Sequence, residues 1–203
     1  MLPYALLCVL TILILPSMAL ATEEPKFTVE KKGPRYEIRT YPEVLVAETE
    51  VNGGFEDAGN AGFRILADFI FGNNQAKEKI GMTAPVAQAK SEKIAMTAPV
   101  SMAARGQGFV IQFTMPAKYT LNTLPAPNNP LIHLRLIPAR RVAVHAYSGD
   151  WSMATYEKHL EIFRSALAQD GLVTIGGPVF ARFNPPFWPW FLRRNEIWLE
   201  LGK

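Results

Sequence analysis

The sequence predicts a single α+β domain, in which antiparallel strands curve toward a barrel and one helix from each of two similar halves packs on the sheet. Two observations predict this class. A pair of strand-like segments joined at a proline is followed by a segment with helical spacing, and this order occurs twice along the chain. Because each half is too short to bury its own apolar faces, we expect the two halves to share one core.

The first half begins with two strands. Tyr36–Tyr41 and Val44–Val51 are rich in β-branched and aromatic residues, and Pro42 lies at the corner between them. The spacing of apolar residues then changes to three and four, which predicts a helix that begins near Phe55 and ends at Gly72. The apolar positions on one face of this helix are Phe55, Ala58, Gly62, Phe63, Leu66, Phe69 and Ile70.

The second half repeats this order. Ile132–Ile137 and Arg141–Tyr147 alternate like strands, with Pro138 at the corner between them. A helix is expected to follow Trp151 and to end at Gly171. Its apolar face is formed by Tyr156, Leu160, Phe163 and Leu167.

The two halves correspond position by position at their corners. Phe55 and Trp151 are 96 residues apart, and so are Pro42 and Pro138. This spacing indicates an internal duplication with two pseudo-symmetric halves. Residues 124–130 join the halves, and because their prolines exclude both a helix and a central strand, we expect a stiff connector at the surface.

The N-terminal segment, residues 1–21, has the layout of a secretory signal peptide. Leu6–Leu15 is almost wholly apolar, and Ala19–Ala21 forms a cleavage site of small residues ahead of a polar segment. No Lys or Arg precedes the apolar stretch, although signal peptides usually have one there. The main alternative is that residues 1–21 are retained as an N-terminal anchor.

Cleavage after Ala21 leaves residues 22–203 as the domain and removes Cys8, the one cysteine of the chain. Disulfides, zinc–thiolate sites and cysteine nucleophiles are then excluded. The net charge of +3 is small and dispersed, so a nucleic-acid partner is not expected. We predict a monomeric periplasmic or secreted protein with no stable membrane span once the signal is removed.

An almost exact octapeptide repeat stands in the middle of the chain. Lys79–Val86 and Lys93–Val100 differ at one position, where Ala95 replaces Gly81. We expect two similar strands joined by a polar loop, with the prolines at strand ends or edges because they lack an N–H donor. Met82 and Met96 would then lie in comparable positions of the barrel wall.

Four motifs together resemble the SOUL family of haem-binding proteins. They are M-T-A-P-V in both copies of the repeat, Y-E-I-R-T-Y at 36–41, P-A-R-R-V-A-V at 138–144 and R-R-N-E-I-W-L-E-L at 193–201. The resemblance covers Phe27 to Leu201 and is that of an exported bacterial member. It implies a distorted antiparallel β-barrel flanked by two long helices, and non-covalent haem as the cofactor.

The resemblance also implies an apolar groove beside the first helix. The positions of this sequence that match it are Phe63, Arg64, Leu66, Ala67, Ile70, Phe71 and, in a later loop, Trp188. The charged half of the family's site is largely missing. Thr40 replaces a histidine that some members carry, and Asn60, Asp68 and Trp188 stand where basic residues are expected.

The remaining candidate iron ligands are interpreted as structural. His133, His145 and His159 are expected to be surface or hydrogen-bonded histidines, and no H-x-x-x-H pair indicates a metal site. The predicted function is therefore non-enzymatic binding of haem or a related tetrapyrrole, as a carrier, buffer or sensor, mainly through apolar contact.

Two alternatives stay open. An enzyme acting on a small hydrophobic substrate could use the same groove, although G-x-S-x-G and metal-ligand clusters are missing from the sequence. A binder of lipids or other apolar ligands is the second, because the proline-fixed loop Phe183–Phe191 contains five aromatic residues. This loop is expected to close over the core, to form a lip of the groove, or to contact a membrane or partner.

Overall fold

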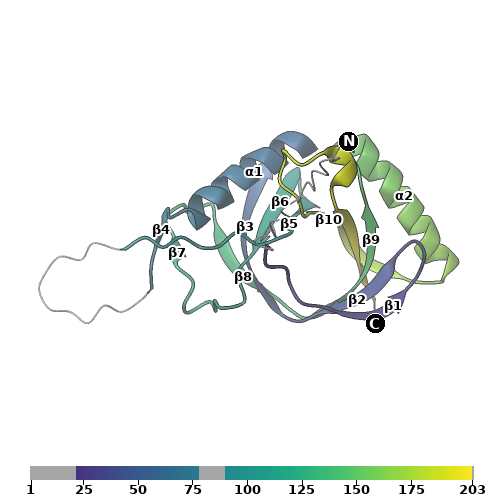
Figure 1. The fold of residues 1–203 in the computed structure, drawn as a ribbon, viewed down its shortest axis with the longest axis horizontal. Helices are drawn as coiled ribbons and strands as arrows, with labels where there is room; N and C mark the ends of the chain where they lie inside the picture. Colours follow the sequence, from purple (N-terminus) through teal and green to yellow (C-terminus); the bar gives the residue numbers. More distant parts are fainter. Residues whose placement is uncertain (1–21, 78–89, 203) are drawn as a thin grey trace, which may run out of the picture.

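The computed structural model describes residues 22–77 and 90–202, which form one α+β unit (Figure 1). The elements of the first half are β1 (Thr28–Lys32), β2 (Glu37–Tyr41), β3 (Val44–Asn52), α1 (Phe55–Ile70), β4 (Asn74–Gln75), β5 (Val100–Arg105) and β6 (Gly108–Thr114). Those of the second half are β7 (Ala126–Pro127), β8 (His133–Ile137), β9 (Arg140–Tyr147), α2 (Met153–Gln169), β10 (Thr174–Arg182), the 3₁₀ helix η1 (Trp190–Leu192) and β11 (Asn195–Leu201).

Nine strands form one antiparallel sheet in the order β1-β2-β9-β11-β10-β5-β6-β3-β8. If β2, β3, β5 and β6 are matched with β8, β9, β10 and β11, this order without β1 reads the same from either end. The seam between the halves is the β5–β10 pair, in which Met102 lies opposite Phe180. The duplication indicated by the sequence is therefore present in the strand pairing.

The sheet curls but does not close, so the expected barrel is not confirmed. In the described ladders β1 pairs with β2 and β8 pairs with β3, which leaves these two strands at the edges. Figure 1 looks along the curl, with α1 and α2 on its outer side. The observed class is an open antiparallel α+β sheet carrying two helices.

The main core lies between the helices and the outer face of the sheet. Phe69 of α1 and Phe163 of α2 are fully buried in it, together with Phe180 of β10. The packing of α1 depends on Gly62, because a Cβ at this position would lie 2.6 Å from Cγ1 of Ile111. A side chain at this point would push the helix off the sheet.

The inner face of the curl is also filled. Tyr41, Val142 and Trp198 pack there, and buried Glu196 accepts hydrogen bonds from the guanidinium of Arg39 at 3.1 Å. The hollow between these strands measures about 10 Å³, which is room for about one water molecule.

The helix positions predicted from periodicity are confirmed, as are the strand pairs around Pro42 and Pro138. The second copy of the octapeptide is not a strand, since β5 begins only at Val100 and residues 93–99 lie outside the described sheets. Its Thr97 hydroxyl donates instead to the carbonyl oxygen of Thr114, and Pro99 has no N–H for a ladder. Lys79–Val86, with Met82, lies outside the described residues, as do residues 1–21.

The connector between the halves, residues 124–130, is partly buried, although the sequence predicts a surface segment. Leu124 is fully buried, and β7 within the connector pairs with β4. Within residues 22–77 and 90–202, neither helix combines the length and the apolar character needed to span a bilayer.

Candidate functional site

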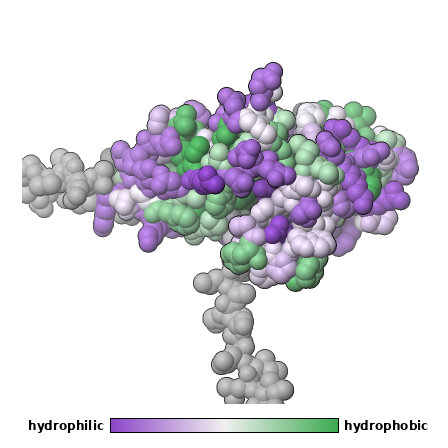
Figure 2. Space-filling view, turned by 90° about the horizontal axis from the view of Figure 1, so that it is seen from above, coloured by the Kyte–Doolittle hydropathy of each residue, from purple (hydrophilic) through white to green (hydrophobic). Residues whose placement is uncertain are grey.

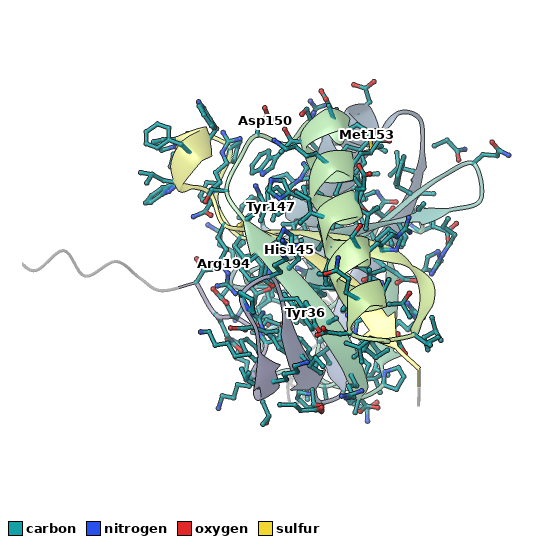
Figure 3. All side chains as sticks on the ribbon, turned by 90° about the vertical axis from the view of Figure 1, so that its right-hand side faces the viewer. Tyr36, His145, Tyr147, Asp150, Met153 and Arg194 are labelled. Carbon is teal, nitrogen blue, oxygen red and sulfur yellow. The ribbon has the colours of Figure 1, made fainter. Side chains whose placement is uncertain are left out.

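A pocket of about 280 Å³ opens where the N-terminal ends of the two helices meet the end of β10. Its walls come from α1, from the turn before α2 and from the last residue of β10. The lining residues are Glu56, Asn60, Asp150, Trp151, Ser152 and Arg182. Figure 3 shows this end of the molecule, with Asp150 and Met153 at the start of α2 and η1 standing beside them.

Arg182 is the unusual group of this pocket. Its guanidinium carbon lies 4.8 Å from the ring centroid of Trp151, 5.1 Å from that of Phe180 and 5.6 Å from that of Phe55. The Nε and Nη2 atoms are buried and have no hydrogen-bond partner within the described residues. Buried donors of this kind are rare, because each one loses its bonds to water without replacement.

The close approach of Arg182 to α1 depends on a glycine. A Cβ at Gly59 would lie 3.3 Å from Nη1 of Arg182 and 3.6 Å from its Nη2. The absence of a side chain at position 59 therefore lets the guanidinium lie against the helix. The duplicated positions Phe55 and Trp151 supply two of the three rings around it, so the pseudo-symmetry of the fold builds this enclosure.

The charge of Arg182 has no compensating carboxylate in contact. Burial lowers the pKa of its guanidinium to about 10, and the charges of Tyr147 and Glu56 oppose this shift only in part. Glu56 lines the same pocket but forms no ion pair with Arg182. Because an enclosed cation without a partner is energetically unfavourable, the site is complementary to an anion.

The loop between β10 and β11 is attached to the pocket through Arg193. The guanidinium carbon of Arg193 lies 4.3 Å from the ring centroid of Trp151. Arg193 also donates from Nε to the carbonyl oxygen of Trp188 at 2.9 Å and from Nη2 to that of Pro186 at 2.7 Å. Trp151 is itself held by a hydrogen bond from Nε1 to Oδ1 of Asn195.

The carboxylate of Asp150 is engaged in the start of α2. Its Oδ1 accepts from the backbone N–H of Ser152 at 3.0 Å and from the Ser152 hydroxyl at 2.6 Å. These hydrogen bonds lower the pKa of Asp150. Ser152 in turn caps the helix by accepting from the N–H of Thr155.

The seven residues implied by the family resemblance do not gather in one cavity. Leu66, Ala67 and Ile70 are buried in the core, because their helix face packs on the sheet. Phe63 is half-buried with its ring centroid 5.4 Å from that of Phe113. Arg64 and Phe71 are exposed on α1, and Trp188 is exposed on the β10–β11 loop.

Of the seven residues implied by the family resemblance, Phe63 shares a helix face with two residues that line the pocket. Glu56 and Asn60 line the pocket, and Phe63 follows on the same face of α1 because residues spaced by three and four share a face. Trp188 is linked to the pocket through Arg193. The sequence did not indicate Trp151 or Arg182 as site residues. Signals for both are present in it, because Trp151 is the duplicate of Phe55 and Arg182 directly precedes the aromatic loop Phe183–Phe191.

A larger hollow of about 790 Å³ lies at another end of the sheet. Its apolar lining includes Leu45, Met115 and Leu136. Its charged lining residues are Glu23, Glu24, Lys26 and Glu43. Carboxylates outnumber basic groups in both linings, since the smaller pocket has Glu56 and Asp150 beside Arg182. The smaller pocket is distinguished by Arg182, whose Nε and Nη2 have no hydrogen-bond partner among the described residues.

The histidines have the structural roles expected for them. Nδ1 of His145 donates to the carbonyl oxygen of Arg35 at 2.6 Å, and its Nε2 lies 3.2 Å from Nδ1 of His159. His133 is exposed. Across residues 22–77 and 90–202, no three His, Cys, Asp or Glu side chains are grouped as a metal site would require.

The molecule is an α+β domain with an open antiparallel sheet, two helices and a pocket at the N-terminal ends of these helices. The family model described as "SOUL heme-binding protein" matches residues 22–200, and the chain belongs to this family. It is 26% identical over 170 residues to "Heme-binding protein 1" of Xenopus tropicalis, covering 83% of this chain and 85% of the relative. The Xenopus laevis protein of the same name is 27% identical with the same coverage.

Solved structures with little sequence similarity share the fold. The C-terminal domain of EcmrR superposes with a TM-score of 0.59 at 10% identity, over 83% of this chain and 98% of that chain. A hydrolase from Listeria innocua superposes with a TM-score of 0.52 at 11% identity, over 85% and 94%. At these identities the similarity establishes the fold and not the activity.

Proposed function

We propose that this protein binds haem or a related tetrapyrrole without covalent attachment, with one ligand carboxylate at Arg182 and the macrocycle against α1 and the β10–β11 loop. Membership of the SOUL family supports tetrapyrrole binding in general. The observation that carries the specific proposal is the enclosed Arg182 guanidinium, which has two buried N–H groups without partners. A carboxylate accepting from this guanidinium would satisfy these donors and the charge together.

The dimensions of the pocket suit one arm of the ligand and not the whole macrocycle. A volume of about 280 Å³ lies just below the range of about 300–1,000 Å³ typical for complete ligand pockets. The ring system would therefore rest outside, where Trp188 and Phe63 offer partly exposed apolar surface. Such a site is shallow, so we expect it to bind hemin with moderate affinity.

Iron ligation by the protein is not part of this proposal. The six lining residues include no His, Cys, Met or Tyr, and His145 and His159 are hydrogen-bonded to each other elsewhere. The residues present therefore fit the carboxylate and the ring of a haem but supply no axial ligand. The role of this chain would be to bind and orient the porphyrin by its edge.

The test compares hemin with its dimethyl ester, which lacks the free carboxylates. In Arg182→Gln we expect hemin to bind about tenfold or more weakly, since a hydrogen bond to a charged group contributes about 1.5–3 kcal/mol. Binding of the ester should not change. The Soret band measures both affinities, and Leu136→Asp in the larger hollow is the control that leaves both unchanged.

Equal losses for hemin and ester in Arg182→Gln would contradict the carboxylate assignment. Loss of binding in Leu136→Asp would place the ligand in the larger hollow. If hemin did not bind even to the wild-type protein, the tetrapyrrole proposal itself would fail.

The carrier, buffer or sensor role and the exported location belong to the same proposal. Residues 1–21 support export by their sequence. A carrier returns its ligand unchanged, whereas an enzyme acting at the same groove consumes it. Extraction of intact hemin after long incubation with the protein, at unchanged total absorbance, would support the carrier; steady loss of hemin with product formation would support the enzyme.

A further inference from the structure

The β10–β11 loop exposes a concentrated apolar surface. The exposed fractions are 83% for Phe187, 42% for Trp188, 60% for Trp190, 58% for Phe191 and 59% for Leu192. All five lie within six consecutive residues, whereas other exposed large apolar side chains of the described chain are scattered. An apolar patch of this density marks a contact surface.

The loop is held in place by its own hydrogen bonds. The N–H of Trp188 donates to the carbonyl oxygen of Pro185 at 3.1 Å, and that of Leu192 donates to the carbonyl oxygen of Pro189 at 2.9 Å. Arg193 clamps the carbonyl oxygens of Trp188 and Pro186. The exposure is thus built into the loop, because prolines and clamps stop the aromatic side chains from folding back onto the core.

The patch protrudes from the body. Figure 3 shows η1 and its aromatic side chains standing away from the sheet and α2. Figure 2 looks down on the face with the two helices, where hydrophilic groups cover much of the surface and hydrophobic groups stand at several places, the lower edge among them. A narrow protruding loop of this kind inserts into the interfacial region of a lipid bilayer more readily than it packs on the flat surface of a protein partner.

The base of the loop also lies next to the N-terminal part of the domain. Nη1 of Arg194 is 3.0 Å from Oε2 of Glu24. Glu24 follows closely on residues 1–21, whose Leu6–Leu15 stretch is apolar by sequence. The described chain therefore begins beside the loop, and a membrane that receives the apolar segment would be close to the aromatic side chains.

We propose that residues Phe187–Leu192 dock onto the interfacial region of a lipid bilayer. Phe187, Phe191 and Leu192 enter the boundary between headgroups and acyl chains, while the tryptophans take the interfacial position that their amphipathic rings favour. The tetrapyrrole proposal shares Trp188 of this loop, whereas the bilayer proposal is tested at Phe187 and Phe191, which the tetrapyrrole proposal does not use.

The test uses the full chain with vesicles of phosphatidylcholine and phosphatidylglycerol, some of them carrying lipids brominated near the headgroups. Because residues 1–21 are apolar themselves, the readout is quenching of tryptophan fluorescence and not simple vesicle association. We expect strong quenching in the wild type and a loss of about threefold or more in the double variant Phe187→Ser/Phe191→Ser. Phe71→Ser, at an aromatic position just after α1 that is about as exposed as Phe191, is the control that leaves quenching unchanged.

Exposed positions tolerate such changes, so circular dichroism should show unaltered folding in all variants. Equal quenching in the double variant and the wild type would overturn the proposal, as would no quenching in either. If the wild type instead forms dimers that the double variant cannot form, the loop is a self-association surface and the bilayer assignment is wrong. Hemin binding by the double variant is measured separately and should match the wild type, because the tetrapyrrole proposal does not use Phe187 or Phe191.

Discussion

At the residue scale, two enclosed arginines differ in their partners. Burial lowers the pKa of Arg39, but Glu196, Tyr41 and Glu37 more than offset this, so the pKa lies above its ordinary value. Arg182 has no such neighbours in hydrogen-bond contact, and burial lowers its pKa to about 10. The first arginine is part of an ion-pair network on the inner face of the sheet, whereas Nε and Nη2 of the second have no partner among the described residues.

Opposite stability changes are expected when these arginines are removed. Arg182→Leu should raise the free energy of unfolding by about 1 kcal/mol, because an unpaired enclosed charge is replaced by apolar packing. Arg39→Leu should lower it by about 1–3 kcal/mol, because buried Glu196 loses a charged hydrogen-bond donor and keeps only Arg194 and Trp198. Urea denaturation of the ligand-free variants measures both; a large loss of stability in Arg182→Leu would show that Arg182 has partners after all.

At the scale of elements, α2 is connected to the sheet through a pair of histidines. His145 of β9 donates from Nδ1 to the carbonyl oxygen of Arg35, so its neutral Nε2 can only accept, and Nδ1 of His159 must donate to it. The ring of Tyr147 stacks on His159 with centroids 4.0 Å apart. A proton taken up at Nε2 of His159 leaves the hydrogen bond to His145 in place.

This pair predicts a pH-dependent stability. Burial is the main cause that lowers the pKa of His159, followed by the positive charges of His145 and Lys158. The unfolded chain therefore binds a proton near pH 6.5, while the folded chain binds it only at lower pH. Stability is full above about pH 6.5 and falls as the pH drops toward the lower pKa of the folded state.

Thermal unfolding between pH 7.5 and 5 measures this slope. His159→Gln keeps an N–H donor for His145 but does not titrate, so its melting temperature should fall less across this range. His133→Gln, at an exposed histidine, should behave as the wild type. If His159→Gln retained the full slope, another group would be responsible.

At the scale of the whole molecule, the two halves are interleaved in one sheet. β2 of the first half pairs with β9 of the second, β8 of the second pairs with β3 of the first, and β5 pairs with β10 at the centre. Removal of either half would break these three pairs and leave only the inner ladders β3–β6–β5 or β9–β11–β10, together with the β1–β2 pair. The main core likewise draws on both helices.

Separate fragments should therefore not fold. We expect residues 22–123 and residues 128–203, produced individually, to show little strand signal in circular dichroism and no cooperative thermal transition, because each buries too little apolar surface. The intact chain is the control. A cooperative transition in either fragment would show that the halves are independent units.

Much of the fold could be predicted from local patterns. Pro42 and Pro138 mark the strand corners, and apolar residues spaced by three and four place α1 and α2, because such signals depend on near neighbours in the chain. The prediction that the second octapeptide copy forms a strand was wrong, because it also used only near neighbours in the chain. Its apolar residues suit a strand, but Pro99 has no N–H for a ladder and the Thr97 hydroxyl donates to the carbonyl oxygen of Thr114, so Lys93–Pro99 stays outside the sheet. The family resemblance likewise identified α1 but not which of its residues stay accessible.

The sequence by itself determined the class of the fold, the duplication and the family, because each of these is written in the order and spacing of residues. Tertiary structure decided that the sheet stays open, that Leu66 and Ile70 belong to the core, and that Arg182 lacks a partner. The physical reason is that the state of a buried charge depends on every group around it. For Arg182 these groups are Phe55 and Gly59 of α1 and Trp151 before α2, and they meet around Arg182 only when both halves pair.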